Sequence, residues 1–359
     1  MKILQIINDT NLSNGGAQHI CLNLHKELLN RNIDAELVGI SPMLGGDPVV
    51  SKCRSLNAKL YSFSAFRKVV KRIKKEEPST VIHVHLFPAV LYVTLAKRLG
   101  YISNKILFTE HSTNNNRRDK WYGKMIDKFI YKKVDLIAAI SLGTQMALFN
   151  WLHEISSKIS VIYNGLDDST EITVIPFPTK SETLKLVSIG RLIPLKNYEL
   201  AIQVVSKLKG NGWNVEYQII GTGSHISELL SVCKKYGVEK NVHFLGYQHE
   251  PERFMRDSHI FIMPSFYEGF GLSALKAIKM GLPALVSNVN GLKELAHPEV
   301  EQHVLFNSDS PQELYDRIEN LLSTESNFRF LIQKLHLHGQ NFTLTKMVNN
   351  YIKLYQRLT

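Results

Sequence analysis

The chain has 359 residues, 44% hydrophobic and 21% charged, which is typical of a globular protein of about two domains. It has no run of about 18 apolar residues and its N-terminus begins a strand, so we expect neither a membrane-spanning helix nor a secretory signal. The formal net charge of +11 indicates an acidic partner, whether nucleic acid, anionic lipid or a phosphorylated ligand. Three scattered cysteines fit a reducing cytoplasm and form no metal-binding knuckle.

The N-terminus predicts a strand–loop–helix unit. Residues 2–7 (KILQII) form a buried strand, 17–29 a helix with one apolar face, and 33–40 a second strand. Gly15 and Gly16 end the polar loop that opens this helix. The pair fits a phosphate-binding turn, since helix N-termini attract anions. The alternative is a close strand-to-helix crossing that only needs small residues.

Residues 63–76 (FSAFRKVVKRIKKE) have the pattern of a basic amphipathic helix. Such a helix can lie on an anionic membrane surface. The alternative is an ordinary packed helix whose charged face meets solvent. Seven further arginines and lysines between residues 117 and 133 favour the membrane interpretation for the N-terminal half.

Polar side chains follow two of the next predicted strands. Strands at 80–86 and 105–109 end on His83 and His85 and on Glu110-His111 respectively, and a third strand follows at 134–140. Side chains at the carboxyl ends of parallel strands line the ligand crevice, so His111 is a candidate site residue, although a lone histidine is more often structural. Without a nearby carboxylate, His83 and His85 make a poor metal site, and we expect a metal-independent protein.

A turn-rich stretch divides the chain. Residues 167–183 contain Pro176 and Pro178, and a second series of strands and helices starts at residue 184. Two such series predict two Rossmann-like, doubly wound α/β domains that face each other across a cleft. The expected organisation is an N-terminal domain, a linker, a C-terminal domain and a last helix that packs back on the first domain, at residues 1–170, 171–183, 184–340 and 341–359.

Two cations begin the second series. Gly190 and Arg191 follow the strand at 184–189, and Lys196 comes just before the next helix. Arginine binds phosphate oxygens in pairs and lysine adds a point charge, so we expect a diphosphate site; the alternative is two solvated surface cations. Gly221-Thr222-Gly223 follows the next strand and could let a nucleotide approach the backbone.

The stretch 258–294 is the most informative. A buried strand at 259–263 is followed by the turn Glu268-Gly269-Phe270-Gly271, a helix, and a second strand at 284–287. An acid in front of helix-start amides is expected to face a ligand that carries hydroxyl groups. The alternative is that Glu268 caps the helix and complements its dipole.

Taken together, these motifs resemble those of glycosyltransferase family 4, retaining enzymes with the GT-B fold. The resemblance covers nearly the whole chain and is densest from 184 to 294. Its parts are Gly15-Gly16-Ala17, Glu110-His111, the turn at 162–167, Gly190-Arg191-Leu192, Lys196-Asn197, Gly221-Thr222-Gly223, the strand at 242–246, Glu268 to Leu272, and Gly281 to Glu294.

The resemblance implies roles for these residues. Arg191 and Lys196 would neutralise the diphosphate of a nucleotide-sugar, which is the substrate, with no cofactor. Glu268, helped by the amides of Phe270, Gly271 and Leu272, would hold hydroxyl groups of the donor sugar. His111 would reach that sugar from the N-terminal domain, and Gly16 would approach the diphosphate. The candidate catalytic residues are Glu268, Arg191, Lys196 and His111, and the donor-binding candidates are Gly15, Gly16, Gly190, Arg191, Lys196, Gly221, Gly223, Phe270, Gly271, Leu272 and Lys276.

Lys276 departs from the family pattern, which has a second glutamate at this position, where it binds the nucleotide ribose. A carboxylate accepts hydrogen bonds from hydroxyl groups, whereas an ammonium group only donates. One hypothesis is weakened or rearranged ribose recognition, with Lys276 turned toward phosphate or paired with an acid. The alternative is tolerated drift.

Two functional interpretations follow. The first is a cytoplasmic retaining transferase that moves a hexose or N-acetylhexosamine from a nucleotide-sugar, UDP-linked by expectation, to an acceptor. The basic first domain favours a polyprenyl-diphosphate-linked or glycolipid acceptor and a peripheral position on the inner face of the plasma membrane. The second is a catalytically silent GT-B subunit that supports a partner transferase. The chain shows no stacking motif or recognition helix, so we expect no nucleic-acid partner.

Overall fold

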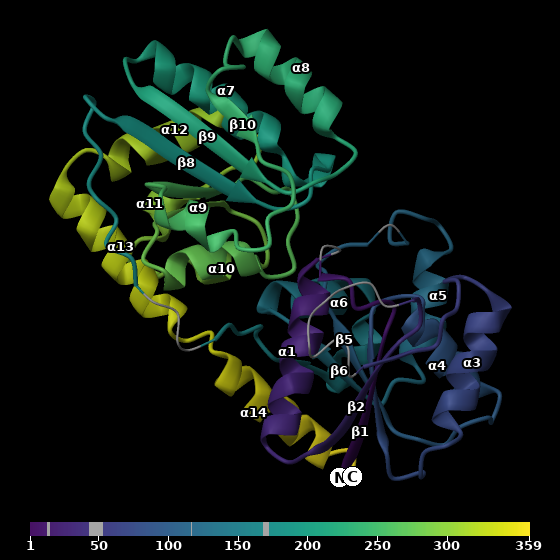
Figure 1. Ribbon diagram of the computed structural model, residues 1–359. Helices are drawn as coiled ribbons and strands as arrows, with labels where there is room; N and C mark the ends of the chain where they lie inside the picture. The colour runs from purple at the N-terminus through teal and green to yellow at the C-terminus, as the bar shows by residue number, and fades with distance from the viewer. Residues whose placement is uncertain (13–14, 43–52, 116, 168–171) are drawn as a thin grey trace. The chain divides into compact units, whose positions relative to one another are not determined.

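The computed structural model describes residues 1–12, 15–42, 53–115, 117–167 and 172–359. The chain forms two compact units: an N-terminal unit of residues 1–165 and 343–359, and a C-terminal unit of residues 166–342 (Figure 1). Each unit is built on one sheet with helices around it, which confirms the predicted α/β class with two Rossmann-like domains. Residues 13–14 of the predicted phosphate loop and 168–171 beside the predicted linker lie outside the described residues.

The N-terminal sheet has seven strands in the order β3-β2-β1-β4-β5-β6-β7. Its strand pairs are parallel, and helices follow β1, β3, β4, β5 and β6. The elements are β1 (Lys2–Ile7), α1 (Gly16–Asn30), β2 (Asp34–Gly39), β3 (Arg54–Ser55), α3 (Phe63–Ile73), β4 (Val81–His85), α4 (Ala89–Arg98), β5 (Ile106–Glu110), α5 (Gly123–Tyr131), β6 (Leu136–Ala139), α6 (Leu142–Trp151), η2 (His153–Lys158), β7 (Ile159–Val161) and α14 (Leu344–Gln356).

The C-terminal sheet has six strands in the order β10-β9-β8-β11-β12-β13. Its strand pairs are parallel too, and β8 lies between β9 and β11. The elements are β8 (Thr183–Ile189), η3 (Pro194–Lys196), α7 (Tyr198–Gly210), β9 (Asn214–Ile220), α8 (Ile226–Tyr236), β10 (Val242–Phe244), α9 (Glu252–Arg256), β11 (Ile260–Met263), α10 (Leu272–Lys279), β12 (Ala284–Ser287), η4 (Lys293–Leu295), α11 (Glu301–Val304), β13 (Leu305–Phe306), α12 (Pro311–Leu321) and α13 (Glu325–Gly339).

Helix α3 is the predicted basic amphipathic helix, and its apolar face is part of the core. Phe66, Val69 and Ile73 are buried against the other side chains of the main hydrophobic cluster of the N-terminal unit. Arg72 is also buried, with ion pairs to Glu36 at 2.6 Å and to Glu76 at 2.5 Å. The structure therefore favours the packed-helix alternative, because this face is not available to a membrane.

Helix α5 starts at Gly123, within the stretch 117–133 that is rich in arginine and lysine. The preceding turn passes directly over the helix start, where a Cβ atom on Gly123 would lie 1.8 Å from the backbone oxygen of Arg117. Arg117 also donates from Nε to Asp127 at 2.9 Å. The residues from 117 to 122 are thus held as turns on top of α5.

The segment predicted as a linker packs on the C-terminal unit from residue 172 onward. Thr173 donates its amide to the carbonyl of Met280 at 2.8 Å, and Arg329 donates to the carbonyl of Ile175 at 2.6 Å. Ile175 is buried. These contacts make residues 172 onward part of the C-terminal unit, which spans Leu166–Phe342.

Helix α14 belongs to the N-terminal unit and lies beside α1 (Figure 1). A chain of buried hydrogen bonds ties it to the sheet: Tyr355 hydroxyl to His83 Nδ1 at 2.8 Å, His83 Nε2 to Thr109 at 2.7 Å, and Thr109 to Tyr351 hydroxyl at 3.1 Å. Buried polar groups need such partners, and here two elements far apart in sequence supply them.

Candidate active site

The strongest candidate site lies at the carboxyl edge of the C-terminal sheet, after the adjacent strands β8 and β11. Lys196 Nζ and Glu268 Oε1 form an ion pair, and each side chain is only 15% exposed. The Ser265 hydroxyl donates to the same Glu268 oxygen at 3.4 Å. The N-cap position of α10 is occupied by Gly271, which has no side chain to cap the helix. The ligand interpretation of Glu268 and the helix-cap alternative both stay predictions.

Gly190 makes room for the lysine. A Cβ atom on Gly190 would lie 2.8 Å from the Tyr198 hydroxyl and 3.3 Å from Cε of Lys196. Any larger residue would therefore push the lysine stem away from Glu268. This gives Gly190 a physical role that its position after a strand did not reveal.

Arg191, next in the chain, is exposed. Its guanidinium forms no hydrogen bond or ion pair within the described part of the chain. An arginine that is not engaged by the protein keeps its paired N–H donors for a ligand anion. The structure thus brings one paired and one unengaged cation to the same strand end.

The turn after Glu268 is shaped by two glycines with positive φ angles. Gly271 (φ +82°) has a backbone conformation that other residues rarely adopt, and its Cβ atom would lie 2.4 Å from a methyl group of Leu292. At Gly291 (φ +92°) a Cβ atom would lie 2.5 Å from the backbone oxygen of Glu268. Phe270 is buried, with its ring 5.2 Å from that of Phe342, and Leu272 begins α10. These contacts fix the backbone on both sides of the candidate carboxylate.

Gly221 and Gly223 have a packing role. Their Cβ atoms would lie 2.0 Å from the backbone oxygen of Gly190 and 2.1 Å from that of Leu192. The loops after β8 and β9 therefore touch backbone to backbone, and Leu192 donates to Thr222 at 2.9 Å. This contact accounts for both glycines without a nucleotide.

Gly15 and Gly16 open α1 as predicted, with Gly16 as its first residue. Gly15 has a φ of +148°, a conformation that favours glycine, and the nearest atom to its Cβ position is 3.9 Å away. A close crossing would show contacts below about 3.4 Å here. Among the described residues nothing crosses this close to Gly15, and the anion-binding alternative stays a prediction for the start of this 15-residue helix.

In the N-terminal unit, His111 contacts a histidine of β4. His85 Nδ1 and His111 Nε2 are 3.1 Å apart, whereas Glu110, the residue before His111, accepts from the buried Tyr131 hydroxyl at 2.7 Å. The two halves of the Glu110-His111 motif therefore separate: the glutamate is part of the core, and the partly exposed histidine lies at the sheet edge.

Burial lowers the pKa of His111 to about 3 and the pKa values of His83 and His85 well below the usual value, so all three rings are neutral near pH 7. One proton then lies between His85 and His111. His85 Nε2 is buried with no hydrogen-bond partner in the described residues. A buried N–H group without a partner is rarer than a buried acceptor without one, so His85 Nε2 is expected to carry no proton. We therefore assign the shared proton to His85 Nδ1, which leaves His111 with its own proton on Nδ1.

Comparison with known proteins decides the family. A model described as "Glycosyltransferase Family 4" matches residues 14–170, and one described as "Glycosyl transferases group 1" matches residues 171–334. The chain belongs to glycosyltransferase family 4. It is thus an enzyme of a family of retaining hexosyltransferases, as the motifs predicted.

The family 4 chain has relatives in surface-polysaccharide assembly. It is 26% identical over 372 residues to an Escherichia coli O-antigen biosynthesis glycosyltransferase, WclY, covering 100% of this chain and 99% of WclY. It is 24% identical over 280 residues to an E. coli UDP-Gal:alpha-D-GlcNAc-diphosphoundecaprenol alpha-1,3-galactosyltransferase, covering 73% and 70% of the two chains. Anabaena HepE, solved in complex with UDP, matches 100% of both chains with a TM-score of 0.80 at 17% identity, which confirms the GT-B fold.

Lys276, the departure from the family 4 pattern, has an acidic partner. Its Nζ lies 3.4 Å from Glu252 on α9, and the two side chains are 29% and 33% exposed. The sequence left two arrangements for Lys276, turned toward a phosphate or paired with an acid. The structure shows the pairing with an acid. A pair this exposed contributes little to stability.

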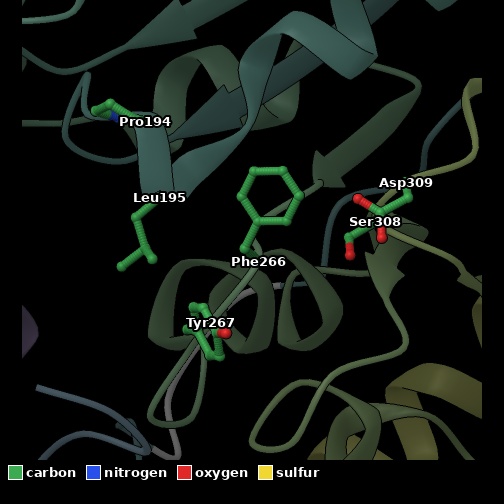
Figure 2. Close-up of a pocket in the computed structure, with 6 residues that line it drawn as sticks. All are labelled: Pro194, Leu195, Phe266, Tyr267, Ser308 and Asp309. Atoms are coloured by element: carbon green, nitrogen blue, oxygen red, sulfur yellow. The ribbon is translucent and has the colours of Figure 1, made fainter. Parts of the chain in front are cut away.

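A pocket of about 430 Å³ shares its loops with the family 4 site (Figure 2). Two residues that line the pocket are sequence neighbours of site residues: Leu195 precedes Lys196, and Tyr267 precedes Glu268. Asn197 ties these loops together, donating from Nδ2 to the carbonyls of Pro264 at 3.1 Å and Ser308 at 2.8 Å. The lining residues are Pro194, Leu195, Phe266, Tyr267, Ser308 and Asp309.

Three contacts of this family 4 chain escaped the sequence reasoning. Ser265 approaches Glu268, Glu252 pairs with Lys276, and His85 holds His111. Ser265 lies three residues before Glu268 at the end of β11, a signal that sequence could have given. Glu252 and His85 are 24 and 26 residues from their partners, and only the sheet and helix packing brings them close.

Proposed function

We propose that the protein transfers a hexose or N-acetylhexosamine from a UDP-sugar to a lipid-linked or polysaccharide acceptor. The observation that carries this proposal is the carboxyl edge of the C-terminal sheet, where Lys196, Arg191 and Glu268 gather. A nucleotide-sugar carries a diphosphate, which cations bind, and sugar hydroxyl groups, which donate hydrogen bonds to a carboxylate. UDP as the nucleotide is further supported by the HepE complex and by the UDP-galactose-dependent relative.

The proposed chemistry is departure of the diphosphate and attack by the acceptor on the same face of the sugar. Negative charge grows on the leaving phosphate as the glycosidic bond breaks. Arg191 and Lys196 would stabilise that charge, while Glu268 accepts hydrogen bonds from sugar hydroxyl groups. Lys196 must then exchange its partner, from the Glu268 carboxylate to a phosphate oxygen, when the donor binds. We expect no metal in this reaction.

The N-terminal unit would contribute His111 and the start of α1. With its proton on Nδ1, His111 is a neutral hydrogen-bond donor, suited to a sugar oxygen rather than to proton removal. Gly16 begins a 15-residue helix, and the N-terminus of that helix would approach the diphosphate.

The acceptor is proposed to be a polyprenyl-diphosphate-linked sugar or another glycolipid. The diphosphoundecaprenol-linked substrate in the name of the galactosyltransferase relative supports it, and so does the net charge of +11. No described helix is long and apolar enough to cross a membrane. We propose that the enzyme acts in the cytoplasm, on the inner face of the plasma membrane.

The test is nucleotide release by the purified chain from UDP-, GDP- and ADP-sugars, with and without membrane lipid extract. Turnover of a UDP-sugar is expected to fall about 100-fold or more in Glu268→Gln and Arg191→Ala. Two surface variants of the same unit, Glu239→Gln and Lys240→Ala, serve as matched controls and are expected to keep wild-type turnover.

Equal activity in the site variants and the controls would remove Glu268 and Arg191 from the mechanism. Donor binding without turnover across the whole panel would instead favour the silent-subunit alternative that Lys276 raised. Turnover only with an ADP- or GDP-sugar would overturn the proposed nucleotide but keep the enzyme class.

A further inference from the structure

Among the described residues, the three most exposed aromatic side chains all belong to the N-terminal unit. Trp121 is 90% exposed, Phe63 73% and Tyr61 72%, and Met125 adds an apolar side chain at 65%. We call these four residues the aromatic rim. They lie at or just before the N-terminal ends of α3 and α5, and α4 lies between these two helices (Figure 1).

Direct contacts connect the two parts of the aromatic rim. The rings of Tyr61 and Phe87 are 6.1 Å apart, and the Arg117 guanidinium lies 4.2 Å over the Phe87 ring. Arg117 is in turn held by the buried Asp127 of α5 at 2.9 Å. Phe87 and Arg117 thus join the start of α3 to the turn that carries Trp121.

The rim is surrounded by positive charge. The stretches 59–68 and 117–126 together contain seven basic residues and one acidic residue, Asp119. Four of these cations are exposed and take part in none of the ion pairs found among the described residues: Lys59, Arg67, Lys120 and Lys124. Their charge is therefore left for an external partner.

We propose that the aromatic rim docks on an anionic lipid bilayer, with Trp121 and Phe63 inserted at the level of the headgroups. Tryptophan and tyrosine favour the membrane–water interface, and neighbouring lysines favour anionic lipid. An ordinary solvent-facing surface has no reason to expose four large apolar side chains within a ring of cations. This docking surface differs from the apolar face of α3, which is buried.

The position of the rim relates it to the proposed function, on which this part of the inference rests. Phe87 follows β4 and His111 follows β5, two neighbouring parallel strands, so the rim and His111 lie at the same edge of the sheet. Docking there would hold the N-terminal unit against the surface that carries a lipid-linked acceptor. The acceptor sugar could then reach the His111 edge while its lipid stays in the bilayer.

The test is sedimentation of the full chain with two kinds of vesicle, phosphatidylcholine alone and phosphatidylcholine with phosphatidylglycerol. Binding is expected only with the anionic vesicles and is expected to weaken as salt increases. Lys120→Gln with Lys124→Gln should weaken it about 25-fold, since each lysine near such a surface contributes about fivefold. Trp121→Ser with Phe63→Ser should abolish it.

The matched control variants make comparable changes, apolar to serine and lysine to glutamine, at exposed positions of the C-terminal unit. Leu230→Ser with Leu337→Ser removes two apolar side chains that are 54% and 62% exposed, and Lys234→Gln with Lys235→Gln removes two cations. Both control variants are expected to bind vesicles like the wild type. Quenching of Trp121 fluorescence by brominated lipid, lost in W121F, would place that ring in the bilayer.

Two outcomes would overturn the proposal. Vesicle binding that survives Trp121→Ser with Phe63→Ser, in protein with an unchanged melting temperature, would exclude the rim as the docking surface. A concentration-dependent dimer that this variant abolishes, without lipid binding by the wild type, would make a second copy of the chain the occupant. Vesicle binding needs no turnover, so an inactive enzyme that still binds through the rim would refute the proposed function alone.

Discussion

The buried His83 and His85 and the partly exposed His111 beside them, all neutral near pH 7, predict that the N-terminal unit loses stability in mild acid. His83, His85 and His111 all have lowered pKa values because burial disfavours the charged ring. In the unfolded chain each imidazole returns to a pKa of about 6.5 and takes up a proton as the pH falls below that value. The unfolded state then binds more protons, so stability is full above about pH 6.5 and is lost as the pH decreases.

The magnitude follows from His111, whose folded pKa is about 3. Between about pH 7.5 and about pH 5, one such group lowers the free energy of unfolding by at most about 2 kcal/mol. His83 and His85 add losses of the same sign. The carboxyl groups of Glu76 and Asp135, whose pKa values are lowered, begin to be protonated only below this window.

The assay is urea unfolding at the two pH values, with the partly buried Trp151 as the fluorescent reporter of the N-terminal unit. His111→Asn is expected to lose less stability than the wild type on going to acid, by up to about 2 kcal/mol, because its titrating group is gone. A matched change at an exposed histidine, His249→Asn, should leave the loss unchanged. Equal losses in wild type and His111→Asn would refute the argument.

Three further outcomes are expected. Gly223→Ala should lower the free energy of unfolding, measured in urea, by several kcal/mol, because its Cβ atom would lie 2.1 Å from a backbone oxygen. Gly210→Ala, at a position with open space around the Cβ atom, should leave it unchanged. Lys276→Glu should lower the KM for the donor about tenfold by supplying a ribose acceptor; an unchanged KM would end the weakened-ribose hypothesis. His85→Asn should keep the Nδ1 proton of His111 in nitrogen-15 NMR spectra and His85→Leu should not, and the same spectrum in both would contradict our proton assignment.

Local sequence patterns were enough to predict the parallel strands, the helices that cross between them and the turns after β8 and β11. They succeeded because apolar periodicity and glycine positions are local signals. The pattern of α3 showed an apolar stripe but not what covers it, and the structure covers it with the core. The exposure of Trp121 and the acid beside Lys276 were likewise invisible, because both depend on where a distant segment packs.

The order of synthesis gives the split N-terminal unit a consequence for folding on the ribosome. The C-terminal unit is inserted between Gly165 and Thr343, whose backbones touch: a Cβ atom on Gly165 would lie 2.1 Å from the oxygen of Thr343. The strands that carry His83 and Thr109 therefore emerge long before α14. We expect a nascent chain to complete the C-terminal unit before α14 can dock on the N-terminal unit, because Tyr355 leaves the exit tunnel last.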